Sequence, residues 1–275
     1  MTKIKTLSRD YPVLFSVLFC VAFLACMRLA GWLYRLTPRT DLWYFLSEAF
    51  DALWPVALSL VLGFGYIYHG KGVGATLVPA LPSFFLRTFV LAVAVYTAVT
   101  EGAQWKPVSA ILGGFMSLVG VGIREEVVFR GIIGNALARK YATDGKGLWK
   151  TVILSAALFS GVHLQNLFLG LDPVAMIAQL VGAFGMGMIF MAVYIRGGNI
   201  WVPIVLHSIV DASGLFESTF TQNAMGAIEE MGEMNLGGLL ILMPIHLGLT
   251  MFLLRKSRRP AIFARLEKLR EASAN

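Results

Sequence analysis

The chain has little charge. Only 14% of its 275 residues are Asp, Glu, Lys or Arg, whereas 57% are hydrophobic. Soluble globular domains are about one-quarter charged, so this composition excludes a soluble domain and predicts a polytopic membrane protein. Cysteine is scarce too: Cys20 and Cys26 both fall in the first apolar run, which indicates small hydrophobic residues rather than a disulfide framework.

Long apolar runs dominate what is present. A membrane span needs about 20 mostly apolar residues, and eight spans are predicted, at 12–34, 43–68, 82–100, 107–138, 149–169, 173–195, 200–216 and 236–254. The fourth is too long for one straight crossing, and the seventh is short. The expected fold is an all-α membrane helix bundle that forms a single domain over residues 1–275.

The net charge of +7 does not indicate nucleic acid, because the basic residues gather at alternate ends of the predicted spans. Those groups are Lys3, Lys5 and Arg9; His69, Lys71 and Arg87; Arg139, Lys140, Lys146 and Lys150; Arg196; and Arg255, Lys256, Arg258 and Arg259. The other loops contain Glu101, Asp172, Glu229, Glu230 and Glu233, with Arg35, Arg39 and Lys106 as mild exceptions. The positive-inside rule then predicts a plasma (inner) membrane protein with both termini in the cytoplasm.

In the tail over residues 256–275, basic and apolar residues alternate. On a helix, Ile262, Phe263, Leu266 and Leu269 fall on one face. We expect a short amphipathic helix on the anionic inner leaflet, with a solvated basic tail as the alternative.

A small polar set stands out inside the predicted spans. Ionised groups within a membrane are costly and indicate a functional site. The set comprises Glu125, Glu126 and Arg130 in the fourth span, His163 in the fifth, and His207 and Asp211 in the seventh. Glu48 and Asp51 lie near the outer end of the second span, where a wet interface explains them.

The spacing of these residues divides their roles. Glu126 and Arg130 are four residues apart and can pair on one helix face, whereas Glu125 points about 100° away. This favours a structural role for Glu126 with Arg130 and a chemical role for Glu125. The alternative is that both glutamates only neutralise Arg124 and Arg130. His207 and Asp211 are also four residues apart, so the carboxylate can orient the imidazole or share a metal with it.

Two kinds of chemistry suit this set. No serine or cysteine is paired with a base, which leaves water as the nucleophile. Glu125 can act as general base while a histidine donates to the oxyanion. Alternatively, Glu125, His163 and His207 bind zinc, although no HExxH motif is present. Both routes hydrolyse amides. The basic rim predicts a cavity that opens to the cytoplasm.

Three short motifs resemble the signature of the CPBP family, the CAAX-processing and bacteriocin-processing membrane proteases also called Abi proteins. They are Glu125-Glu126-xxx-Arg130, Phe159-xxx-His163 and His207-xxx-Asp211, within residues 123–211. The resemblance implies an intramembrane endopeptidase of about eight helices, in which Glu125 activates water, His163 and His207 are catalytic, and Glu126 and Arg130 support their helix. Asp211 stands where eukaryotic relatives have Asn, and an ionised Asp cannot donate a hydrogen bond.

The resemblance leaves the substrate open. A peptide or protein at the membrane is expected as the partner, with no nucleic acid. Two non-proteolytic alternatives remain at this point. One is a non-catalytic bacteriocin-immunity or regulatory protein of the same architecture. The other is a proton-coupled transporter, for which the sequence shows no paired broken spans.

Overall fold

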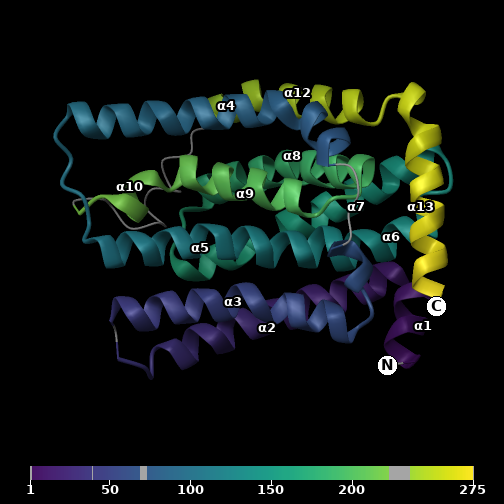
Figure 1. Ribbon diagram of the computed structural model, residues 1–275, viewed down its shortest axis with the longest axis horizontal. Coiled ribbons are helices and arrows are strands. Elements are labelled where there is room, and N and C mark those ends of the chain that lie inside the picture. The colour runs from purple at the N-terminus through teal and green to yellow at the C-terminus, as the bar shows by residue number, and fades with distance from the viewer. Residues whose placement is uncertain (1, 39, 69–72, 223–235, 275) are drawn as a thin grey trace.

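The computed structural model describes residues 2–38, 40–68, 73–222 and 236–274 (Figure 1). Within them the chain is helical, and the only β interaction is an isolated bridge between Trp105 and Thr221. The elements are α1 (Thr2–Asp10), α2 (Pro12–Tyr34), α3 (Asp41–Val61), η1 (Gly65–Tyr68), α4 (Val73–Thr100), α5 (Val108–Glu126), η2 (Val127–Gly134), α6 (Asn135–Tyr141), α7 (Gly145–Val162), η3 (His163–Leu169), α8 (Pro173–Gly197), α9 (Trp201–Gly214), α10 (Phe216–Phe220), α12 (Leu236–Leu253), η4 (Lys256–Arg258) and α13 (Arg259–Ala274).

The predicted all-α membrane bundle is confirmed, but the predicted count of eight spans is not. Six helices in the described part are long and apolar enough to cross a membrane: Pro12–Tyr34, Asp41–Val61, Ala80–Thr100, Val108–Tyr141, Gly145–Leu169 and Pro173–Gly197. The seventh predicted span forms α9, which has only 14 residues. Leu242–Leu253, in the eighth, is likewise a shorter apolar helix.

The helices lie roughly parallel in layers (Figure 1). α2 and α3 form one side and α4 and α12 the other, with α5, α7, α8 and α9 between them. α5 packs against α3 and α9, and α8 packs against α7 and α12. The apolar window of α8 is accordingly 61% buried, whereas that of α4 is 0% buried. The central helices therefore form the protein core, and the outer ones face the surrounding lipid.

Small residues let the central helices approach closely. A Cβ on Gly187 of α8 would lie 3.0 Å from the Cα of Ala156 in α7. A Cβ on Gly122 of α5 would lie 2.5 Å from Ser208 Oγ and 3.0 Å from the carbonyl oxygen of Ile204, both in α9. Gly187 of α8 thus serves packing inside the monomer.

Both termini lie at one end of the bundle, where α13 runs across the ends of the other helices (Figure 1). Ile262 and Leu266 are 1% and 3% exposed and belong to the main hydrophobic core. Arg270 donates to the carbonyl oxygens of Arg139 and Ala142. The tail forms the helix α13, and Ile262 and Leu266 of its apolar face pack against protein, while its binding to the inner leaflet stays a prediction.

Several charged residues used in the sequence-based topology lie outside the described residues. They are Arg39, His69, Lys71, Glu229, Glu230 and Glu233.

Candidate functional site

The two adjacent glutamates end α5, and a π-helical segment, η2, follows them directly. The result is one continuous helical run over Val108–Tyr141, which explains the excess length of the predicted fourth span. π-helical turns are rare and frequently mark functional sites. This one sits immediately after Glu125 and Glu126, near the middle of the run.

Glu126 is fully buried, and one of its carboxylate oxygens interacts with two partners. Its Oε1 lies 2.9 Å from an Arg130 guanidinium nitrogen, which forms the predicted pair on one helix. The same Oε1 accepts a 2.7 Å hydrogen bond from Nδ1 of His207. Because α5 and α9 approach closely at Gly122, a carboxylate on one helix reaches an imidazole on the other. Glu126 therefore orients a histidine as well as pairing with arginine.

His207 presents its second nitrogen to two more carboxylates. Its Nε2 lies 3.8 Å from Glu125 Oε2 and 3.6 Å from Asp211 Oδ2. The ring stacks on Phe190 with centroids 4.9 Å apart. The sequence leaves two roles for Asp211, orienting His207 or sharing a metal with it, and in the structure the hydrogen bond that orients His207 is accepted by Glu126. Asp211 instead faces the reactive side of the ring.

Arg130 closes the site on one side. Its guanidinium lies over Phe159 at 4.2 Å and Phe190 at 5.0 Å from the ring centroids, and its side chain is 0% exposed. A buried cation needs a paired charge, and Glu126 supplies it. The supporting role expected for Glu126 and Arg130 agrees with this geometry.

His163 stands where α7 changes into the 3₁₀ helix η3. Its Nδ1 lies 2.8 Å from the carbonyl oxygen of Phe159. A carbonyl only accepts, so Nδ1 carries the proton, and Nε2 of a neutral ring is left as an acceptor. His163 is therefore fixed in tautomer and rotamer by its own helix.

A cavity of about 650 Å³ joins these groups. Glu125, His163, His207 and Asp211 all line it, so the four residues proposed from sequence as catalytic meet in one space. Glu126 and Arg130 lie behind it. Glu125 is 8% exposed, and within the described part of the chain its Oε2 accepts no hydrogen bond. That oxygen is buried and lies 3.8 Å from Nε2 of His207.

The wall of this cavity contains an ion pair that sequence reasoning missed. Arg124 donates to Asp51 of α3 at 2.9 Å. The sequence explains Asp51 by a wet interface near the outer end of its span. Position within a span does not show which neighbouring helix a side chain contacts. Because Asp51 provides the counter-charge for Arg124, Glu125 is not needed to neutralise that arginine. This removes the main support for the alternative in which both glutamates only neutralise Arg124 and Arg130. Asn166 and Gln179 also line the cavity and bond to each other at 2.9 Å.

The expected opening of the cavity to the cytoplasm stays a prediction, but the cavity lining does not reach the basic end of the bundle. Its exposed lining residues include Trp32 and Arg35, at the end of α2 far from the chain terminus. The cavity thus extends from Glu125 away from the end of the bundle where both termini lie (Figure 1). The basic rim around the termini does not surround its opening.

The zinc alternative stays a prediction. Across the described residues, no three His, Cys, Asp or Glu side chains are grouped so as to hold a metal ion. Glu125, His163 and His207 share the cavity, and the bond from His207 Nδ1 to Glu126 is one that a zinc-bound histidine would also make.

Comparison with known proteins agrees with the motif resemblance. A family model described as Type II CAAX prenyl endopeptidase Rce1-like matches residues 107–213, the segment that carries all seven residues named in the three motifs. Neither the curated proteins nor the solved structures gave a match. This match supports the resemblance of residues 107–213 to the CAAX-processing (CPBP) family of membrane proteases.

Proposed function

We propose that the protein is an intramembrane endopeptidase that cleaves a membrane-associated or lipophilic peptide, with Glu125 activating the attacking water. The single observation that carries this proposal is the unbonded Glu125 Oε2 beside His207 Nε2, at 3.8 Å, in a cavity shared with His163. A gap of that size between base and imidazole is wide enough for a water oxygen or a carbonyl oxygen to contact both groups.

The hydrolysis then follows from the positions of these groups. Glu125 Oε2 takes a proton from water as the water oxygen bonds to the scissile carbonyl carbon. The carbonyl electrons move to its oxygen, which accepts a hydrogen bond from a protonated His207 Nε2. When the oxyanion reforms the carbonyl, the C–N bond breaks, and protonated Glu125 gives its proton to the leaving nitrogen.

The remaining groups position the reactive ones. Glu126 fixes the ring of His207 through Nδ1, as a buried carboxylate does in serine protease triads. His163, with Nε2 free to accept, holds the attacking water or the substrate N–H. Asp211, whose Oδ2 lies 3.6 Å from Nε2 of His207, balances the charge of the protonated imidazole. The whole chain is proposed to lie in the plasma membrane with both termini in the cytoplasm.

The test compares peptides released by membranes that contain wild type, Glu125→Gln or Glu101→Gln. Glu101 lies in the α4–α5 connection and is exposed, so it is a matched control. We expect mass spectrometry to find peptides with wild type and Glu101→Gln that are missing with Glu125→Gln. Identical peptide profiles with Glu125→Gln would overturn the proposal and favour a non-catalytic immunity or regulatory protein.

A further inference from the structure

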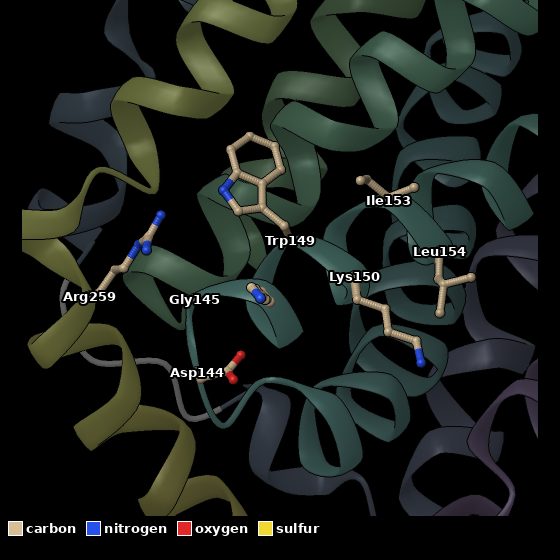
Figure 2. A pocket seen from close by; sticks show the side chains of 8 residues that line it. Asp144, Gly145, Trp149, Lys150, Ile153, Leu154 and Arg259 are labelled. Atoms are coloured by element: carbon tan, nitrogen blue, oxygen red, sulfur yellow. The ribbon is translucent and has the colours of Figure 1, made fainter.

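A second hollow, of about 840 Å³, lies on the surface at the start of α7 and shares no lining residue with the cavity of the candidate site. Three cations line it, Lys146 and Lys150 of α7 and Arg259 of α13 (Figure 2). None of them forms an ion pair with a described residue. Asp144 also lines the hollow, but its Oδ1 accepts a 2.7 Å hydrogen bond from the backbone nitrogen of Gly147 and so caps α7. The hollow therefore has an excess of positive charge.

The cations come from two helices and are held in place. A Cβ on Gly145, the first residue of α7, would clash with Nη1 of Arg259, so the guanidinium lies against the start of that helix. Nε of Arg259 donates to the carbonyl oxygen of Leu254, 3.1 Å away. Nζ of Lys150 lies 3.8 Å from the centre of the Tyr141 ring. In Figure 2, Arg259 approaches Gly145 from one side, and Lys150 extends from α7 on the other.

Beyond the cations the lining of the hollow becomes apolar. Lys146, Trp149, Lys150 and Ile153 are spaced by three or four residues, so they lie on one face of α7. Trp149 is half-buried, and Ile153 is 45% exposed. Ile153 lies about 10 Å along the helix from Lys146. This face of α7 thus passes from charged to aromatic to aliphatic side chains within two turns.

That order matches the boundary of a membrane. α7 begins the run Gly145–Leu169, which is long and apolar enough to cross a bilayer. The first turn of such a helix lies at the level of the lipid head groups, where tryptophan is enriched. Ile153 then lies at the level of the acyl chains. A phospholipid has the same order of groups, and the match holds for either orientation of the protein in the membrane.

We propose that this hollow binds an anionic phospholipid. Its phosphate lies against Lys146, Lys150 and Arg259, and an acyl chain follows Trp149 and Ile153. Basic pockets between membrane helices bind the head groups of anionic lipids. Because Arg259 belongs to α13 and the two lysines belong to α7, one bound phosphate joins the two helices. The lipid therefore stabilises the docking of α13, and this role does not depend on the proposed protease activity.

The test titrates purified protein in detergent with phosphatidylglycerol, or with phosphatidylcholine that has the same acyl chains. Native mass spectrometry counts the bound lipid, and the unfolding temperature is recorded on the same samples. The test variant combines Lys146→Gln with Lys150→Gln, at two exposed positions whose replacement leaves the core intact. The matched control combines Lys140→Gln with Lys256→Gln, because these lysines are also exposed but do not line the hollow.

We expect phosphatidylglycerol to bind wild type and the control equally and to raise their unfolding temperatures more than phosphatidylcholine does. The test variant should bind phosphatidylglycerol roughly 10–30-fold more weakly, because each lysine contributes to the attraction of an anionic head group. It should also lose the additional rise in unfolding temperature.

Three results would overturn the proposal. Equal weakening in the test variant and the control would show attraction to overall charge rather than a site. Equal effects of the two lipids on wild type would show that the anionic head group is not recognised. A full stabilising effect of inorganic phosphate alone would identify a site for a free anion instead of a lipid. Neither lipid binding nor unfolding requires cleavage, so these results are independent of the proposed function.

Discussion

Glu126 and His207 stand 81 residues apart in the sequence and share a 2.7 Å hydrogen bond in the core of the bundle. The same glutamate oxygen lies 2.9 Å from the guanidinium of Arg130. One buried carboxylate therefore links α5, the π-helical segment after it and α9. This link fixes the imidazole beside Glu125 and leaves that neighbouring carboxylate free for chemistry.

The buried pair predicts a large effect of Glu126→Gln on stability. Removing one partner of a buried ion pair strands the other charge and costs about 3–5 kcal/mol. We expect a clearly lower unfolding temperature in detergent and a strong loss of activity, because His207 loses its orienting acceptor. Glu267→Gln is the control, since Glu267 pairs with Arg270 at the surface with its side chain 60% exposed. Equal unfolding temperatures for the two variants would contradict the structural role of Glu126.

His163 is predicted to matter for turnover more than for folding. It lines the cavity and bonds only to its own helix, so His163→Ala removes little packing. We expect a fall in kcat of roughly 10²–10⁴-fold with little change in unfolding temperature. His246 in α12 is 5% exposed and lies outside the cavity lining. His246→Ala should retain turnover per folded molecule, and loss of turnover in both variants alike would argue against a specific role for His163.

The close approach of α5 and α9 predicts a steric effect at Gly122. A methyl group there would meet Ser208 Oγ at 2.5 Å and the carbonyl oxygen of Ile204 at 3.0 Å. Gly122→Ala must therefore separate the helices that carry Glu126 and His207. We expect lower activity and a lower unfolding temperature, both measured on purified protein.

Gly161 provides the comparison within the same site. A Cβ there meets nothing within 4 Å, and alanine is the better helix former by roughly 1 kcal/mol. Gly161→Ala should keep its activity and unfold at the same or a slightly higher temperature. If Gly122→Ala behaved in the same way, the helix contact would not be needed for the site.

Chelation separates the two hydrolytic routes. Since the described residues contain no cluster of three ligating side chains, we expect purified enzyme to keep its turnover after prolonged treatment with a chelator and dialysis. Elemental analysis of the same samples should show metal content that does not track activity. Loss of turnover that added Zn²⁺ restores would reinstate the zinc alternative for Glu125, His163 and His207.

The sequence predicted which residues meet, but not how they bond. Glu126 and Arg130 could be paired in advance because helix geometry places residues four apart on one face. The bond from His207 to Glu126 rather than to Asp211 depends on how α5 and α9 pack at Gly122, and spacing along the chain contains no such information. The pairing of Asp51 with Arg124 was missed for the same reason.

The membrane topology was predicted in part. Composition and the length of the apolar runs were sufficient to predict an all-α membrane bundle, because the length of an apolar run can be read directly from the local sequence. The count of eight is not confirmed, because α9 has only 14 residues and Leu242–Leu253 is likewise short. The direction of the cavity depends on which side of Glu125 is closely packed. Phe129 and Arg130 fill the side toward the chain termini. Only tertiary structure reveals that.

The central claim is that Glu125 performs the chemistry while its neighbour Glu126 supports the structure. The most direct measurement is single-turnover cleavage by purified Glu125→Gln, with the unfolding temperature recorded on the same preparation. We predict a rate lower by roughly 10²–10⁴-fold and an unfolding temperature equal to that of wild type, unlike Glu126→Gln. Cleavage by Glu125→Gln at the wild-type rate would contradict the account.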